Sequence, residues 1–441
     1  MKKFTNLIWV FLLIFGSVHA QQEKGIIGTN NWLYGWTEFK PNLERYGEPT
    51  QIITGNITTD TKLSKRDIYL LIGNVFVTNK ATLTIEPGTV ILGDYKSNAS
   101  LTIAKGAKII ADGLETDPIV FTSNSSLKRS GDWGGIIILG DAPTNKFGNG
   151  SVASYYSNLN KTDYVNTNYG GDNVQNDAGI LKYVRIEFAG KRLKGGGNFN
   201  GILLACVGKK TVLENIMVSY SAGNSLEVIG GEVFLSKIVS YRSNSNDFKF
   251  NYGTQSSLIN SLAVRSPYIS NSSGARCMQI VSYDKEEEVD FTKPETNVVA
   301  KNITLINQSE NLNSDIEKGL VKESVYVAKN TNLEMNKSVI SGFNPAVIFE
   351  EKIIVNQESL KKIVFTDMYF NNCNGNIFVE NNSNNEDLEN WYGNSAFFNV
   401  YSKSYNSETF IDLNNESRPD FRLRINKIIA TNDLDPDLRM D

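Results

Sequence analysis

Short stretches of alternating apolar and polar residues recur along the chain and carry its strongest structural signal. Within residues 214–253, the segment MVSY at 217–220 returns twenty-one residues later as IVSY at 238–241. A turn rich in Ser and Asn follows each copy, and alternating apolar positions then resume. Strict alternation over four to six residues predicts β-strands. A repeat of about twenty residues with no helical stretch predicts a solenoid of β coils.

We interpret this pattern as an all-β fold, a right-handed parallel β-helix. One coil cannot bury its own inward face, whereas stacked coils bury one another and form a continuous apolar column. An antiparallel β-sandwich is the alternative, since it also has short strands and regular turns. A sandwich does not require tandem copies of one coil, which favours the β-helix. In a β-helix, Val218 and Val239 are expected on the same inward face of adjacent coils.

Further coils are predicted on both sides of this repeat. Residues 82–94 and 99–113 each contain Leu-Thr-Ile, a glycine turn and a second β-branched stretch. The Asn-rich residues 371–385 suit the turns of such coils, because Asn tolerates left-handed backbone geometry. We therefore assign residues 51–430 to the β-helix and residues 431–441 to an acidic C-terminal tail.

Residues 1–20 have the features of a secretory signal peptide. Lys2 and Lys3 precede a short apolar run, and the small-residue site ends at Ala20. The apolar run is too short to span a bilayer. We expect an exported chain that begins at Gln21 and has no transmembrane span of its own after the signal is removed.

The composition narrows the chemistry of the exported chain. The one histidine, His19, lies within the predicted signal, which excludes histidine bases and histidine-ligated zinc from the mature protein. A formal net charge of −4 argues against a general nucleic-acid binder. The three cysteines form neither a metal-type pair nor a disulfide framework. No cofactor is expected.

Residues 21–50 precede the coils and are rich in aromatic residues. They include Trp32, Tyr34 and Trp36. A solenoid needs its open end covered, so we expect this segment to form part of an end cap. The alternative is an exposed stacking surface for sugar rings or for a partner protein.

A long polar loop interrupts the coils between residues 143 and 179. It contains four tyrosines, Tyr155, Tyr156, Tyr164 and Tyr169. Long loops without their own secondary structure are often functional, and Tyr combined with Asn and Ser suits recognition surfaces. We expect this loop to bind a partner and to be removable with little loss of stability. The alternative is a flexible insertion.

Three other segments carry weaker chemical signals. Lys191–Asn200 (KRLKGGGNFN) is basic and glycine-rich but matches no phosphate-loop pattern. Asp247 with Lys249 is the nearest approach to a catalytic pair. The tail residues Asp433, Asp435 and Asp437 resemble a calcium loop, but a leucine replaces the required glycine and no bidentate Glu follows. No metal site is therefore expected.

Several motifs resemble a family of exported right-handed β-helix proteins. They are EPGTVILGD (86–94), ASLTIAKGAKIIADG (99–113), DPIVFTS (117–123), GDWGGIIILGDAPTN (131–145) and PDFR (419–422). That family is common in Gram-negative bacteria rich in TonB-dependent outer-membrane receptors. The resemblance covers most of residues 50–430 and implies the fold, but it implies no shared activity. Relatives are usually rich in Asp where this chain has SNSNDFKF at 243–250, in which only Asp247 is acidic.

These observations favour a non-enzymatic binding or assembly protein at the outer membrane or cell surface. The expected partner is an outer-membrane protein, such as a TonB-dependent receptor, or its cargo, and carbohydrate is the other ligand class considered. One alternative is a polysaccharide-active β-helix enzyme, a pectate-lyase-like protein or a hydrolase, by analogy of fold. Another is a surface adhesin or structural protein. Stacked carboxylates in a groove would favour the enzyme, and exposed Tyr and Trp would favour binding.

Overall fold

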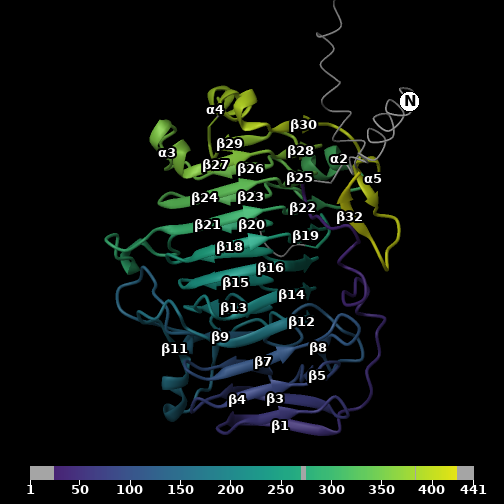
Figure 1. Ribbon diagram of the computed structural model, residues 1–441, viewed down its shortest axis with the longest axis vertical. Helices are drawn as coiled ribbons and strands as arrows, with labels where there is room; N and C mark the ends of the chain where they lie inside the picture. The colour runs from purple at the N-terminus through teal and green to yellow at the C-terminus, as the bar shows by residue number, and fades with distance from the viewer. Residues whose placement is uncertain (1–23, 270–274, 383, 425–441) are drawn as a thin grey trace, which may run out of the picture.

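The chain folds into a tall stack of β coils. The computed structural model describes residues 24–269, 275–382 and 384–424, so the predicted signal peptide and Asp433, Asp435 and Asp437 lie outside the described residues. Strands of successive coils pair in parallel, and the ladder rises from β1 at one end to β30 at the other (Figure 1). The predicted right-handed parallel β-helix is confirmed.

Each full coil contributes strands to three parallel faces, which we call the first, second and third face. The first face contains the second half of β3 (Ile68–Val77), β6 (Ser100–Ile103), β9 (Ile136–Leu139), β13 (Ile202–Ala205), β15 (Leu226–Ile229), β17 (Phe248–Asn251), β20 (Met278–Ile280), β23 (Val325–Val327), β26 (Val347–Phe349) and β29 (Ile377–Val379).

The second face contains β2 (Thr61–Leu63), β4 (Thr82–Ile85), β7 (Lys108–Asp112), the first halves of β12 (Gly179–Glu187), β14 (Val212–Ser219) and β16 (Glu232–Tyr241), and then β18 (Gln255–Ile259), β21 (Thr296–Lys301), β24 (Thr331–Asn336) and β27 (Ile363–Thr366).

The third face begins with β1 (Gln51–Ile57), whose last residues reach the first face, and with the first half of β3. It continues with β5 (Val90–Gly93), β8 (Ile119–Ser123), the second halves of β12, β14 and β16, β19 (Leu262–Arg265), β22 (Thr304–Asn307), β25 (Val339–Ser341), β28 (Tyr369–Asn371) and β30 (Val400–Ser402).

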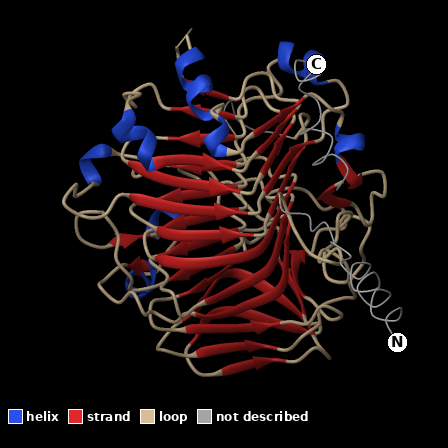
Figure 2. Ribbon diagram, turned by 45° about the horizontal axis from the view of Figure 1, so that its top comes forward, coloured by secondary structure: helices blue, strands red, loops and turns tan. Residues whose placement is uncertain are grey.

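The remaining elements lie in loops or outside the column (Figure 2). They are β10 (Gly150–Ser151), β11 (Asn168–Tyr169), β31 (Phe410–Asp412), β32 (Asp420–Leu423), α2 (Leu312–Glu317), α3 (Gln357–Lys362), α4 (Glu386–Tyr392), α5 (Asn406–Thr409), and the 3-10 turns η1 (Ala153–Tyr155), η2 (Lys161–Thr167), η3 (Glu286–Glu288) and η4 (Ser395–Phe397). None of the described helices is long and apolar enough to cross a membrane.

Single left-handed residues turn the chain from the second face to the third. Asn215, Lys237, Asn260 and Asn302 all have φ between 48° and 56° at this corner. One such residue rotates the chain without a loop, so two faces share one continuous strand in β12, β14 and β16. Asn occupies several of these corners because it tolerates this geometry better than most residues.

The pairing of β14 with β16 corrects the predicted register. Met217 lies opposite Val239, and Val218 lies opposite Ser240, so equivalent positions are twenty-two residues apart here rather than twenty-one. Val218 belongs to the inner column, whereas Val239 packs in a separate cluster on the outside of the third face. The repeated Val-Ser-Tyr therefore does not mark equivalent positions in the two coils.

The outside of the third face is covered by residues 24–50, which we call the strap. Lys24 Nζ lies 2.8 Å from Asp367 near the last coils, and the Ile27 amide donates to Asn260 Oδ1 at 2.8 Å. At the other end the Thr50 amide donates to the Ile68 carbonyl at 2.8 Å. The strap thus runs lengthwise down the stack, as the purple trace in Figure 1 shows. This differs from the predicted end cap, because the outward side chains of the third face are themselves apolar and need cover.

The C-terminal end of the column is closed by α4. Leu388 and Tyr392 from this helix are buried in the same cluster as the inward residues of the coils. Tyr392 Oη donates to the Ile363 carbonyl at 2.6 Å. After β30, the β31–β32 hairpin packs on the strap, where Phe421 lies 6.0 Å from Phe39. The stack of described coils therefore ends at β30, before the predicted limit at residue 430.

Candidate functional site: a polar groove on the first face

The outward residues of the first face change from apolar to polar along the stack, and after Gln279 the row becomes apolar again. Ile137 and Leu203 occupy one outward row, and the same row continues with Glu227, Lys249 and Gln279. Alternation places these side chains opposite the buried Phe248 and Phe250 of the same strand region. Three successive polar residues in one row have no core-forming function, so this stretch is the candidate site.

Lys249 is held between two carboxylates at the centre of this row. Its Nζ lies 3.1 Å from Glu227 and 2.9 Å from Asp284. Burial alone would lower the pKa of Lys249, but the Glu227 and Asp284 carboxylates outweigh that effect and raise it above its ordinary value. Lys249 therefore keeps its proton at neutral pH and acts as a fixed cation, not as a base.

A ladder of asparagine side chains borders the row. Asn200 Oδ1 accepts from the Asn224 amide at 3.2 Å, Asn224 Oδ1 accepts from the Asn246 amide at 3.2 Å, and Asn246 Oδ1 accepts from the Arg276 amide at 2.9 Å. Each side chain thus satisfies a backbone donor in the next coil. The side-chain amides of Asn200 and Asn224 also donate to Glu227 Oε2, at 2.8 and 3.1 Å. The ladder keeps the floor of the site polar and rigid.

Lys249 and the three asparagines of the ladder, with Glu227 buried beside them, line an open groove of about 760 Å³. Its other wall is the basic loop 191–200, in which Arg192 and Asn198 form an antiparallel bridge. Lys191 Nζ fixes the base of the loop by donating to the Tyr95 carbonyl at 2.7 Å. The exposed Arg192 also lines an adjoining pocket of about 270 Å³, so the groove continues along the loop. Within the described ranges, Arg192 forms no ion pair.

The tyrosine-rich loop lies beside this groove but is mostly buried. Tyr156 and Tyr169 belong to a cluster that covers Ile137 and Leu203 on the outside of the first face. Tyr155 is partly buried against Phe199, with ring centroids 5.3 Å apart. The expectation of a dispensable recognition loop is therefore wrong for Tyr156 and Tyr169, because their rings are core residues of a satellite cluster. Tyr164 alone among the four tyrosines is largely exposed, at 52%.

The strap aromatics are likewise divided between core and surface. Trp36 is fully buried, stacked 6.2 Å from Trp32 and in an edge contact with Tyr183 at 5.9 Å. Trp32 is partly buried, and Tyr34 is 44% exposed with Arg418 5.9 Å above its ring. These residues lie on the third face, so the structure does not bring them together with the tyrosine-rich loop.

Asp247 and Lys249 do not form a shared site. Asp247 is fully buried at the corner between the third and first faces, where Arg265 Nη1 lies 2.9 Å from its carboxylate and Ser240 donates to it. Asp247 therefore neutralises a buried arginine, while Lys249 lies in the groove. In the part of the chain that the structure describes, no group of three or more His, Cys, Asp or Glu side chains could hold a metal ion.

A second unusual acid lies under the strap. Glu187 is buried on the third face, with Oε1 3.3 Å from Arg185 Nε. Arg185 Nη2 in turn donates to Tyr46 of the strap at 2.6 Å. Burial raises the pKa of Glu187 to about 7, and the nearby Arg185 cation only partly opposes that effect.

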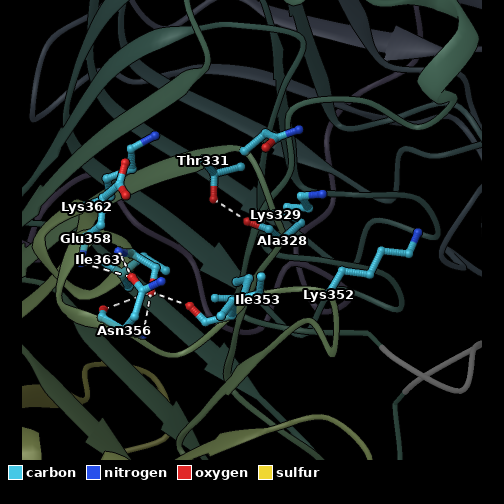
Figure 3. A pocket seen from close by; sticks show the side chains of 12 residues that line it. Ala328, Lys329, Thr331, Lys352, Ile353, Asn356, Glu358, Lys362 and Ile363 are labelled. Atoms are coloured by element: carbon cyan, nitrogen blue, oxygen red, sulfur yellow. Dashed lines mark hydrogen bonds between the residues drawn. The ribbon is translucent and has the colours of Figure 1, made fainter.

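A smaller pocket of about 210 Å³ lies between β23, β24 and α3. Three lysines line it, Lys329, Lys352 and Lys362, but Figure 3 shows that their side chains do not converge on one point. Lys352 pairs with Glu350 and Lys362 with Glu295. The lysines are thus partly neutralised and do not build an anion site.

The groove lies within the part of the chain that also carries a family relationship. A model of the pectate-lyase like beta helix domain family matches residues 55–408, which is more than half of the chain. The chain belongs to this family. Membership agrees with the β-helix part of the sequence resemblance, while the link to receptor-rich bacteria stays a prediction.

One solved structure is similar to the chain. It is an alginate lyase from Paenibacillus sp. str. FPU-7, with 13% sequence identity over 73% of this chain and 73% of that chain, at a TM-score of 0.18. No match to a curated protein was found.

Sequence reasoning missed Glu227 and Asp284, and it noted the basic loop that contains Arg192 without connecting it to this strand. Glu227 could have been found as the one acidic residue within the apolar stretch LEVI, at the position equivalent to Lys249. Asp284 and Arg192 come from loops, and no local pattern places them beside that strand.

Proposed function

We propose that this protein is directed at polysaccharides and that the first-face groove binds a stretch of an acidic polysaccharide. The observation that carries the proposal is the open polar groove lined by Asn246 and Lys249 beside the exposed Arg192, which forms no ion pair among the described residues. Long polar grooves with fixed hydrogen-bonding groups suit an extended chain of hydroxyl-rich sugars. Membership in a family described by its likeness to pectate lyases supports the same ligand class.

The charges of the groove favour an acidic ligand. Glu227 and Asp284 share Lys249 and leave one negative charge, which the two exposed cations of the loop, Arg192 and Lys194, outweigh. A guanidinium group recognises a carboxylate with two parallel hydrogen bonds, which makes Arg192 the residue best suited to a uronate.

We propose binding without cleavage as the form of this activity. Cleavage of a uronate chain by elimination needs a group that can accept a proton near neutral pH. Lys249 is held protonated by its two carboxylates. Burial, followed by the nearby Glu227 charge, raises the pKa of Tyr155 above its ordinary value, so its hydroxyl also keeps its proton.

Calorimetry with purified protein tests the proposal. We expect polygalacturonate or alginate oligosaccharides to bind and neutral oligosaccharides of equal length to bind weakly. Arg192→Ala should lower the affinity about tenfold, since hydrogen bonds between charged groups are worth about 1.5–3 kcal/mol. Arg45→Ala removes an exposed arginine from the strap and serves as the matched control. Equal binding of acidic and neutral ligands, or none of either, would reject the proposal.

The same samples decide between a binder and an enzyme. Elimination creates an unsaturated sugar that absorbs ultraviolet light, so its appearance over hours would assign catalysis to this face. We expect no such product. Export of the protein and its association with an outer-membrane receptor or its cargo stay predictions that this experiment does not address.

A further inference from the structure

The N-terminal end of the β-helix presents an unpaired strand edge. β1 pairs with β3 and β2 pairs with β4, each on the side that faces the rest of the stack. No strand among the described residues pairs with the other edge of β1 or β2. Backbone N–H and C=O groups along that edge therefore lack the partners that every coil in the middle of the stack has.

The apolar floor of this end is incompletely covered. Ile53 and Ile57 point inward in the first coil and are only partly buried. Leu71 and Val77, their partners in the next coil, are 2% and 0% exposed. Ile52, on the outside of the same strand, is 64% exposed. The first coil thus has the composition of an interior coil without a neighbour beneath it.

The β1 part of the edge lacks charge and proline, two features that usually prevent strand pairing, whereas β2 carries Lys62. Residues 50–59 (TQIITGNITT) contain no charged residue and no proline. Natural proteins normally protect exposed edges with charges, proline or a covering element, because unprotected edges pair with other strands. The strap passes along the third face and reaches this end only at its own last residues, where Thr50 bonds to Ile68.

The opposite end of the column is protected. There α4 lies over the last coils, with Leu388 and Tyr392 buried against the inward residues. A second molecule consequently cannot continue the stack head to tail. The arrangement left is head to head, in which two identical N-terminal ends meet around a two-fold axis.

We propose that the N-terminal end of this β-helix is the interface of a homodimer, formed by antiparallel pairing of the β1 edges of two copies. A two-fold axis through the third face sets Gln51–Thr54 against the same segment of the second copy. The same axis sets the first-face part of β1 against β2 of the second copy. The β1 edges carry no charge, and Lys62 on β2 faces the uncharged end of β1, so the copies meet without like-charge repulsion. The partly exposed floors of both columns then become one core.

Light scattering coupled to size-exclusion chromatography tests this interface. We expect the wild-type protein to have twice the mass of its polypeptide. The variant Ile52→Lys/Thr54→Lys places like charges on neighbouring strands of the paired sheet, and we expect it to have the mass of one polypeptide. Both replaced side chains are exposed, so the coil itself should still fold. Should this double variant not fold, Ile52→Lys alone serves the same purpose.

The matched control is Val212→Lys/Phe234→Lys. These exposed positions lie on β14 and β16, whose strands are paired on both sides in the middle of the stack. The control should stay dimeric and melt within a few degrees of wild type, and the edge variants should keep the β-sheet circular dichroism of the folded coil. If the wild-type protein has the mass of one polypeptide, the proposal is wrong. This holds also if a strand of another protein pairs with this edge. An edge variant that stays dimeric would likewise overturn the proposal.

Discussion

The third and first faces of the column share one inner core but differ on the outside. Outward residues of the third face include Met217, Val239 and Leu262, and the strap covers them. The equivalent outward row of the first face carries Glu227 and Lys249, and Lys249 borders an open groove. The inward pattern therefore builds the fold, while the outward pattern decides which face is covered and which face can bind a ligand.

The first face follows the same rule between β9 and β17. Where its outward residues are apolar, at Ile137 and Leu203, the tyrosine-rich loop covers them. Where they become polar, the loop ends and the groove begins. The strap and the tyrosine-rich loop thus have the same structural role, because each covers apolar side chains on the outside of the solenoid.

Among the variants that test this comparison, Trp36→Ala is expected to lose the most stability. Removing this fully buried ring should lower the free energy of unfolding by about 3–5 kcal/mol. Tyr34→Ala, two residues away but exposed, should change it by less than about 0.5 kcal/mol. Urea denaturation measures both. Equal effects would mean that the strap is not packed on the third face.

A somewhat smaller loss is expected from Tyr156→Ala. The ring is buried between Phe76 and Phe199, with centroid distances of 5.1 and 6.1 Å, so its removal should cost about 2–4 kcal/mol. Tyr164→Ala in the same loop is the control, because that ring is largely exposed. If both variants are as stable as wild type in urea, the loop does not contribute to the core and the comparison of the two faces fails.

The third face should also show the stronger dependence on pH. The pKa of Glu187 is about 7 in the folded protein against an ordinary value of 4.5, so the unfolded chain loses this proton more readily. The contribution of protonated Glu187 to the free energy of unfolding is fully present below pH 4.5. It is lost as the pH rises through about 7, by at most about 3 kcal/mol. Denaturation curves between pH 4.5 and 8 measure it. Glu187→Gln should flatten this part of the profile, and an unchanged profile in that variant would contradict the assignment.

The smallest stability effect is expected in the groove wall. Lys194→Ala should leave the free energy of unfolding within about 0.5 kcal/mol of wild type, because the side chain is exposed. Its loss should still weaken binding of an acidic oligosaccharide a few-fold at low salt, since exposed charges act through screened attraction. A large loss of stability would show that the loop holds the first face together.

The alternation of apolar residues was sufficient to predict the fold, but it could not set the register. Corner residues Tyr220 and Arg242, both with φ near 54°, are equivalent positions twenty-two residues apart. The similar segments MVSY and IVSY suggested a repeat of twenty-one residues, since Val, Ser and Tyr are acceptable on either side of a strand. A shift of one residue exchanges inward and outward positions, which is why Val239 was assigned to the wrong side.

The candidate site was harder to predict for a related reason. Composition does not distinguish a tyrosine that covers a sheet from one that binds a partner, so Tyr156 and Tyr169 had the same signal as Tyr164. The site joins Arg192 and Lys249 of the groove with Asp284, the partner of Lys249, from three separate segments. Their proximity follows from the number of residues in each coil and loop, which the alternation pattern does not contain.

The strap has a consequence for how this molecule unfolds. A plain solenoid behaves as a row of neighbouring units, and its terminal units can fray without disturbing distant ones. Here one segment contacts Asp367 at one end and Ile68 at the other, so it adheres along nearly the whole row. Loss of the first or last coils removes part of its attachment, and loss of the strap uncovers the third face along its length. We therefore expect a single cooperative transition, with amide protons at both ends of the third face exchanging at similar rates.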